Sequence, residues 1–282
     1  MEIRPLDKNT LLNEALCGHG DILIKSELTD EERTGLRAAE IKAEWLKKMM
    51  PKGLAAQIAF DGEESIGFIE YMPIELSLFY KGKDLYVINC TVAPHTPPWG
   101  KPRRERIPGC GSALVNAMIE DIKDKCNGIV GFYGVAYTSD VKGFFIKLGF
   151  EEFENKGIKK LIKKFRPFEF PEPVKYENKY QFKPIPGKVV IDTFWRSMCS
   201  SCPQALVKLR DVCKEFGDKV ILNEFCVDEK ENMEKYGVEG ITYFNGKQQF
   251  YPYELSKEKI RGILRKLLEE RTAPPYFGQK GA

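Results

Sequence analysis

The order of apolar and polar positions along residues 1–165 predicts an α/β domain. Residues 35–50 repeat apolar side chains about one helical turn apart, which predicts an amphipathic helix. Short apolar runs bounded by turn residues predict strands, and the Asp61-Gly62 pair predicts a hairpin between two of them. The predicted strands cover residues 2–5, 54–60, 65–72 and 85–93. We therefore expect a mixed α/β sheet that begins antiparallel.

A proline-rich stretch and a glycine-rich turn follow the fourth predicted strand. Residues 94–106 hold four prolines and a glycine, a composition that argues against regular structure. Residues 107–112 form a glycine-rich turn directly before a predicted helix. Three further elements are expected to complete the domain: a strand at 129–137, a helix at 139–148 and a closing strand at 158–165.

A second α/β pattern begins after residues 166–187, where five prolines predict a linker or a strap. Strands and helices alternate in this pattern, and Ser256 is placed to cap the last helix. Strands are predicted at 188–194, 219–225, 241–244 and 248–252, and helices at 202–216, 229–236 and 256–270. The expected organisation is a first domain at 1–165, the linker at 166–187, a second domain at 188–272 and a frayed tail at 273–282.

Composition and charge narrow the classes of function. The 282 residues are 43% hydrophobic and 30% charged, which is the balance of a soluble globular protein. A net charge of +3 is too small to predict nucleic-acid binding, and no apolar run approaches the length of a membrane span. The first residues lack the apolar core of a signal peptide, so we expect a cytoplasmic protein whose eight cysteines are thiols or redox groups. Only His19 and His95 could serve a histidine-based metal site or a catalytic triad, so no metal site is predicted.

The turn from Arg106 to Ser112 is the first candidate binding site. A glycine-rich turn at the start of a helix offers unpaired backbone N–H groups and the positive end of the helix dipole, and both attract a pyrophosphate. Gly109 and Gly111 let the backbone approach phosphate oxygens, whereas Pro108 removes one N–H donor. Taken alone, the same turn is also compatible with a tight packing corner.

Two flanking motifs give this turn a context that resembles the GNAT superfamily of N-acetyltransferases. Val92-Ala93-Pro94 is similar to the end of the family's fourth strand, and Phe144 to Phe150 is similar to the ending of its last helix. The resemblance implies that acetyl-CoA binds with its pyrophosphate on the turn and its pantetheine arm along residues 90–92. It also implies direct attack by an amine on a thioester whose carbonyl is polarised by a strand N–H. The implied cofactor-binding residues are Cys90, Thr91, Val92, Arg106, Ile107, Pro108, Gly109, Cys110, Gly111, Ser112 and Phe145.

The residue that protonates the leaving CoA thiolate departs from the family pattern. The tyrosine that often has this role corresponds to Phe145, and a phenylalanine cannot donate a proton. Tyr137 is the candidate replacement, with Tyr133 and Tyr86 as further candidates. Protonation by solvent is another route, because a thiol with a pKa near 8.5 is an easy leaving group.

Carboxylates and thiols near the expected cofactor supply the other candidates for catalysis. Glu70 and Glu75 could accept the amine proton, the alternative being a carboxylate that is simply solvated at a strand end. Cys90 and Cys110 lie beside the expected cofactor. Covalent acyl transfer through either thiol stays open next to the alternative of small buried packing residues.

The second predicted domain carries a Cys199-Ser200-Ser201-Cys202 motif between a strand and a helix. A thiol at a helix N-terminus is favoured as thiolate, and a second thiol one turn along can close a disulfide. Residues 189–195 and 219–228 resemble the thioredoxin superfamily, which implies Cys199 as the nucleophile and Cys202 as the resolving thiol. Residues 239–244 lack the family's cis-proline, so redox sensing, soft-metal capture and an inert pair stay open beside thiol-disulfide exchange.

A GNAT domain followed by a degenerate thioredoxin-like domain resembles the YoaP family over nearly the whole chain. The resemblance implies acetyl transfer from acetyl-CoA to an amine, with the dithiol domain used for redox control or substrate presentation. The expected partner is a small-molecule amine or a thiol-containing acceptor, and neither a nucleic acid nor a membrane. The alternatives are an acyl-CoA-binding redox sensor and a thiol-disulfide oxidoreductase with little acetyl transfer.

Overall fold

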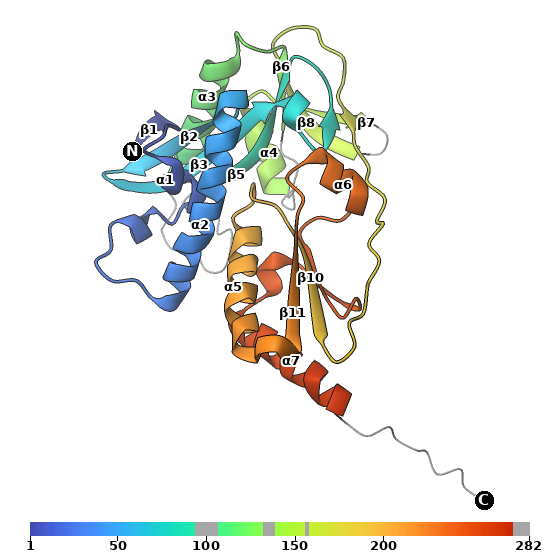
Figure 1. Ribbon diagram of the computed structural model, residues 1–282. Helices are drawn as coiled ribbons and strands as arrows, with labels where there is room; N and C mark the ends of the chain where they lie inside the picture. Colours follow the sequence, from blue (N-terminus) through green and yellow to red (C-terminus); the bar gives the residue numbers. More distant parts are fainter. Residues whose placement is uncertain (94–106, 132–138, 156–157, 273–282) are drawn as a thin grey trace, which may run out of the picture. The chain divides into compact units, whose positions relative to one another are not determined.

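The chain forms two compact units. The computed structural model describes residues 1–93, 107–131, 139–155 and 158–272 (Figure 1). The first unit comprises Met1–Tyr176 with Ser197–Ser200, and the second comprises Glu177–Arg196 with Ser201–Ala282. Each unit has its own sheet and its own hydrophobic core.

A mixed sheet forms the centre of the first unit. Its order in the described residues is β1-β2-β3-β5-β6-β8-β7, and every neighbouring pair is antiparallel except β5 with β6. The antiparallel start and the mixed α/β class agree with the sequence-based prediction. The strands are β1 (Glu2–Pro5), β2 (Ala55–Asp61), β3 (Glu64–Pro73), β5 (Leu85–Val92), β6 (Gly128–Val130), β7 (Glu151–Asn155) and β8 (Ile158–Lys164).

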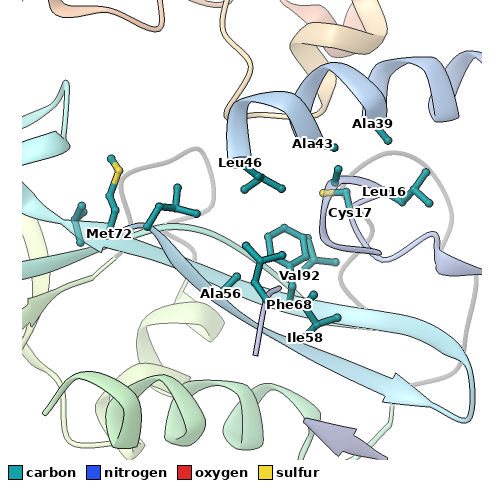
Figure 2. Packing of buried hydrophobic residues seen from close by; sticks show 14 of the residues in the cluster. Leu16, Cys17, Ala39, Ala43, Leu46, Ala56, Ile58, Phe68, Met72 and Val92 are labelled. Atoms are coloured by element: carbon teal, nitrogen blue, oxygen red, sulfur yellow. The ribbon is translucent and has the colours of Figure 1, made fainter. Parts of the chain in front are cut away.

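Helices cover both faces of this sheet (Figure 1). Leu46 of α2 packs on Phe68 of β3 on one face, as Figure 2 shows. Leu114 of α3 packs with Ile69 of β3 on the opposite face. Phe68 and Ile69 belong to different cores because successive side chains of a strand point to opposite faces. The helices are α1 (Leu11–Ala15), η1 (Gly20–Leu23), α2 (Asp30–Met49), η2 (Met50–Lys52), η3 (Ile74–Leu76), α3 (Cys110–Ile122) and α4 (Ser139–Lys147).

Helix α2 begins at Asp30 rather than at residue 35, where the apolar pattern starts. Thr29 caps its N-terminus, because the Thr29 hydroxyl accepts from the N–H of Glu32 at 3.3 Å. The Glu32 carboxylate in turn accepts from the Thr29 N–H at 2.9 Å, which completes a capping box. The polar first turn is therefore held by capping, not by an apolar face.

The proline-rich segment 166–187 is an ordered strap and not a free linker. Its first part belongs to the first unit, where β9 (Glu172–Pro173) pairs with β4 (Tyr80–Lys81) and the Tyr176 hydroxyl donates to the Leu78 carbonyl at 2.8 Å. Its second part packs on the second unit, where the Tyr180 ring stacks on Tyr243 with centroids 4.1 Å apart. Hydrogen bonds and ring stacking hold this segment in place. Because its apolar residues follow no regular period, the sequence did not show that it is ordered.

The second unit has the element order β10-α5-β11-α6-β12-β13-α7. Its sheet order is β11-β10-β12-β13, with β10 and β11 parallel and the remaining pairs antiparallel. Leu209 of α5 and Leu264 of α7 pack on one face, and Phe194 and Phe225 stack on the other with Tyr236. The elements are β10 (Val189–Trp195), α5 (Ser201–Phe216), η4 (Gly217–Lys219), β11 (Val220–Cys226), α6 (Lys230–Tyr236), β12 (Ile241–Phe244), β13 (Gln248–Phe250), η5 (Pro252–Glu254) and α7 (Lys257–Thr272).

Some predicted features are present in the structure, and others fall outside the described residues. The predicted cap at Ser256 is confirmed, since its hydroxyl accepts from the Lys259 N–H at 3.1 Å. Strand β7 and helix α1 were not predicted. The irregular stretch 94–106, most of the strand expected at 129–137 and the tail 273–282 lie outside the described residues. Across the described ranges, no helix combines the length and the apolar character needed to cross a membrane.

Candidate functional site

The glycine-rich turn stands at the start of α3, as the sequence predicts. Gly109 is the N-cap residue and adopts φ 82°, a left-handed conformation that favours glycine. The N–H groups of Gly111 and Ser112 have no backbone acceptor among the described residues, as expected for the first turn of a helix. Gly109 is exposed, and no atom of the described residues lies within 4 Å of the place where a Cβ would stand. The turn is therefore open on its outer side and does not form a closed packing corner.

Strand β5 loses its parallel neighbour halfway along its length. Pairing between β5 and β6 runs from Leu85 with Gly128 to Val87 with Val130. Gly131 continues the pairing with β8, on the opposite side of β6, since its N–H donates to the Leu161 carbonyl at 2.6 Å. Within the described residues, Ile88 to Val92 consequently have an unpaired backbone edge on the β6 side.

Glu70 lies inside β3 and is completely buried, so the expectation of a carboxylate solvated at a strand end is wrong. Lys42 of α2 is equally buried, and its Nζ lies 2.7 Å from Glu14 Oε1 and 3.4 Å from Glu70 Oε2. Nζ also lies 4.8 Å from the centroid of the Phe68 ring. The Asn89 amide donates to Glu70 Oε1 at 3.1 Å. One ammonium thus holds two buried carboxyl groups from α1 and β3.

The two carboxyl groups of this buried cluster interact with each other as well as with Lys42. Glu14 Oε2 and Glu70 Oε2 have no ordinary hydrogen-bond donor, yet the two side chains contact each other. Burial raises the pKa of Glu14 well above its usual value, and the neighbouring Glu70 adds to this rise, whereas Lys42 opposes it. Burial would lower the pKa of Lys42, but the two carboxyl groups outweigh it and raise that pKa well above the ordinary lysine value.

Two thiols border the same cluster. Cys90 of β5 is paired with Glu70 of β3 in the sheet register, and its thiol donates a hydrogen bond to the sulfur of Cys17. This hydrogen bond, with the nearby charge of Lys42, lowers the pKa of Cys17. The same bond and burial raise the pKa of Cys90 well above that of a free thiol. Cys17 is therefore the more acidic thiol of the pair.

The other expected residues around the cofactor are structural in their contacts. The Thr91 hydroxyl donates to the Phe68 carbonyl at 3.1 Å, and Val92 is a buried core residue. Cys110 is buried at the start of α3, and burial raises its pKa to about 11. Phe145 is buried against Phe150 at a centroid distance of 5.1 Å.

The candidate proton donors and the second candidate base are less central. Tyr137, Tyr133 and Arg106 lie outside the described residues. Tyr86 is half-buried against Tyr71, and burial raises its pKa. Glu75 Oε1 accepts from the N–H of Asp84 at 3.0 Å, a contact that closes a turn. None of these described groups joins the cluster around Lys42.

The Cys-Ser-Ser-Cys motif stands at the start of α5. Cys199 is half-buried and precedes the helix, whereas Cys202 is buried in its first turn. Neither is part of a disulfide. Gly240 faces the motif, since a Cβ there would stand 3.9 Å from the Cys202 sulfur. In the part of the chain that the structure describes, no peptide bond is cis and no group of three or more metal-ligating side chains is present.

Glu14, Lys42 and Cys17 were missed by sequence analysis. Lys42 and Glu14 lie 28 positions apart, so no local spacing relates them. One signal was readable: Lys42 interrupts the apolar side of the predicted helix 35–50, and a lysine there needs a buried partner. Cys17 carries no such signal, because a lone cysteine before a glycine is common in turns.

Comparison with known proteins gives likenesses to solved structures only. No protein-family model and no curated protein sequence matches the chain. PaiA N-acetyltransferase from Thermoplasma acidophilum, in complex with coenzyme A, is 15% identical over 58% of this chain and 99% of its own, with a TM-score of 0.39. Ribosomal-protein-alanine N-acetyltransferase from Brucella melitensis is 17% identical over 57% and 97%, with a TM-score of 0.38. A GNAT family acetyltransferase from Brucella melitensis, in complex with acetyl-CoA, is 14% identical over 60% and 90%, with a TM-score of 0.37. These three TM-scores are all below 0.5.

Proposed function

We propose that this chain is an N-acyltransferase that moves an acetyl group from acetyl-CoA to an amine, and that its first unit carries the reaction. The observation that carries the proposal is the open turn before α3. Gly109 in its left-handed conformation leaves the N–H groups of Gly111 and Ser112 without a backbone acceptor among the described residues, on an outer side free of atoms. Such a turn suits a pyrophosphate, because N–H groups and the helix dipole both favour an anion.

The unpaired edge of β5 gives the acyl group a place on the same sheet. The backbone of Ile88 to Val92 lacks a strand partner on the β6 side in the described residues. An extended pantetheine arm can pair with such an edge in the way a peptide strand does. When bound, acetyl-CoA supplies an acyl group that is activated towards nucleophiles. An N–H of the edge would then polarise the thioester carbonyl, which lowers the barrier to attack.

Glu70 is the candidate base within this arrangement, acting as part of a cluster and not alone. It lies opposite Cys90 in the register of β3 and β5, on the side of β5 away from its unpaired edge. Lys42 and Glu14 hold its carboxyl group in place. A carboxyl group held in place in this way is the type of side chain that can take a proton from an incoming ammonium. The acceptor class that this suits is a small-molecule amine, or a thiol-containing compound.

The second unit is proposed to be thioredoxin-like and to serve redox control or substrate presentation. Its element order supports this: a parallel βαβ unit is followed by two antiparallel strands and a helix. Cys202, one turn along, is placed to resolve a disulfide formed at Cys199. The combination of the two units keeps the resemblance to the YoaP family as part of this proposal.

Coenzyme A binding tests the proposal directly. We expect titration calorimetry to show that the chain binds CoA, and that Gly109→Val weakens binding by about tenfold or more, since a β-branched residue strains a positive φ and turns the N–H groups away. Gly62→Val is the matched control. Gly62 also has a positive φ, 62°, and a Cβ added to it would also meet no atom within 4 Å, but it lies in the β2–β3 hairpin.

Turnover with a panel of amines completes the test. Release of CoA thiol from acetyl-CoA should depend on the amine supplied, and the amide product should be detected by mass spectrometry. Absence of CoA binding by the unmodified chain would overturn the proposal. Equal loss of affinity in the Gly109 and Gly62 variants would show that the turn before α3 is not the binding site.

One alternative is favoured by a specific observation, the reduced dithiol of Cys199 and Cys202 at a helix start. It is an acyl-CoA-binding redox sensor, or a thiol-disulfide oxidoreductase, with little acetyl transfer. Reduction of a protein disulfide such as insulin by the intact chain, together with CoA binding that produces no amide, would favour this alternative over the transferase.

A further inference from the structure

We propose that Cys17 and Cys90 form a covalent acyl-transfer site, in which Cys90 takes the acyl group from the thioester and Cys17 receives the Cys90 proton. The inference rests on the proposed function and deepens it, because the acyl group would pass through an enzyme thioester before it reaches the acceptor. Sequence analysis left the role of Cys90 open between chemistry and packing, and did not identify Cys17. The arrangement of the two thiols favours chemistry.

A β-bulge sets the direction of the Cys90 side chain. Glu70 pairs with Cys90, and the next residue of β3, Tyr71, pairs with Ile88, so Asn89 is an extra residue in β5. A bulge breaks the strict alternation of side chains at the point where it occurs. Cys90 packs against the core under α2, half-buried, within the part of β5 that lacks a partner on its β6 side in the described residues. The thiol is therefore next to the strand edge where the thioester is proposed to bind.

Cys17 is brought to this thiol by a backbone conformation that is uncommon for a residue with a side chain. Its φ is 58°, and that of the following Gly18 is 80°. A Cβ on Gly18 would stand 3.0 Å from a Val92 methyl group, so the turn is packed tightly on the end of β5. Figure 2 shows Cys17 between helix α2 and the side chains of Phe68 and Val92. Non-glycine residues at positive φ are strained, and such strain gathers at functional sites.

The hydrogen bond between the two thiols determines their roles. Cys90 donates to Cys17, and the pKa of Cys17 falls while that of Cys90 rises. Lys42 adds a positive charge beside the pair, with Glu14 and Glu70 as its counter-charges. The half-buried Cys90 can contact an acyl group, whereas Cys17 is 5% exposed and contacts Cys90. Cys90 is thus placed as the nucleophile, and Cys17 as the base that activates it.

The transfer step balances without any further reactant. As the Cys90 sulfur attacks the carbonyl carbon of acetyl-CoA, its proton passes to the Cys17 thiolate. The bond between that carbon and the CoA sulfur breaks, and the CoA thiolate takes the proton from Cys17. The products are S-acetyl Cys90 and CoA thiol, and Cys17 is again a thiolate. One thioester replaces another, so the step is close to isoenergetic.

This step also supplies the proton donor that the sequence lacks. Phe145 stands where a tyrosine would protonate the CoA thiolate, and its ring is buried among other aromatic rings. Protonated Cys17 has a thiol proton of the acidity that another thiolate requires. The remaining thiols of α3 and its C-terminal end do not offer such a pair, since burial raises the pKa of both Cys110 and Cys126.

Trapping of the acyl-enzyme tests the proposal on the intact chain. The protein is mixed with acetyl-CoA in the absence of an amine, quenched in acid and measured by intact mass spectrometry, and its peptic peptides are mapped. We expect one acetyl group per chain, labile to neutral hydroxylamine as a thioester is, on the peptide that contains Cys90. Cys90→Ala should carry none. Cys17→Ser should reach the same extent about 100-fold more slowly, as expected for loss of a general base.

Cys126→Ser is the matched control, because Cys126 is a buried thiol of the same unit. Its sulfur hydrogen-bonds to backbone groups of Ile122, at 3.2 Å, Gly128 and Tyr86, and to no other thiol among the described residues. It should acylate at the unmodified rate. Mapping in the unmodified chain does not depend on how well any variant folds. An acetyl group on another residue, or CoA binding and amide formation with no trapped thioester, would overturn the thiol proposal and leave the proposed function standing. Absence of CoA binding would instead remove both.

Discussion

At the scale of single residues, the buried Lys42 is the group on which the candidate site depends. Its ammonium lies within 2.7 Å of Glu14 and 3.4 Å of Glu70, and all three side chains are completely buried. Burial of a charge is costly unless the charge is paired. The arrangement therefore depends on all three side chains, one ammonium and two carboxyl groups.

Removal of the ammonium should destabilise the first unit strongly. We predict that Lys42→Met lowers the free energy of unfolding by about 3–5 kcal/mol, since it leaves a buried carboxylate without its partner. Chemical denaturation followed by circular dichroism measures this. Lys47→Met is the control on the same helix: its ion pair with Glu44 is 4.0 Å long, its side chain is 67% exposed, and its loss should cost less than about 0.5 kcal/mol. A loss for Lys42→Met as small as that for Lys47→Met would show that the cluster is not charged.

At the scale of elements, the capping box of α2 links local sequence to pH-dependent stability. Lys25 and the N–H and hydroxyl of Thr29 bond to the Glu32 carboxylate and lower its pKa from 4.5 to about 2. A carboxyl group with a lowered folded pKa contributes its full stability above the unfolded pKa. That contribution is lost as the pH falls through the folded pKa.

We predict that Glu32→Gln lowers the thermal midpoint at pH 7 and has a progressively smaller effect between pH 4.5 and about 2, the interval spanned by the two pKa values. Below that interval the wild-type carboxyl group is protonated and resembles the amide. Glu40→Gln, at an exposed position of the same helix, should leave the midpoint nearly unchanged at every pH. A Glu32→Gln deficit that stays constant down to pH 2 would contradict the assignment.

The elements also show which parts of the structure were readable in the sequence. The hairpin at Asp61-Gly62, the glycine turn before α3 and the cap at Ser256 are encoded within a few residues, and the structure contains them. The polar first turn of α2 was encoded as locally, by Thr29 and Glu32, but an apolar pattern does not detect a cap. Strand β7 pairs Glu152 and neighbouring polar residues with β8, so its stability comes from the partner strand.

The candidate site was less predictable than the fold for a physical reason. Glu70 was identified, but its partners Glu14 and Lys42 come from two other elements, and only the packing of α1 and α2 on the sheet brings them together. The bulge that directs Cys90 depends on the pairing of β3 with β5. No residue type in β5 predicts this bulge. Long-range contacts of this kind leave no periodic trace in a sequence.

At the scale of the whole molecule, the two units have separate cores, and this predicts separate responses to core substitutions. Leu114 of α3 and Leu209 of α5 are both completely buried, one in each unit. Either change to alanine removes the same atoms and leaves a cavity, at a cost of about 2–5 kcal/mol. The two variants are therefore matched in chemistry and differ only in the unit that they weaken.

Hydrogen exchange followed by mass spectrometry can show which elements each substitution destabilises. We predict that Leu209→Ala accelerates exchange in β10, β11 and α5 and leaves α3 and β5 unchanged, and that Leu114→Ala has the opposite pattern. The reason is that exchange in a protected strand follows the opening free energy of its own cooperative unit. Equal acceleration in both units by either variant would mean that they unfold as one body. In that case a redox change at the Cys199–Cys202 dithiol would alter the stability of the acyl site as well, and control by the second unit would need no separate signal.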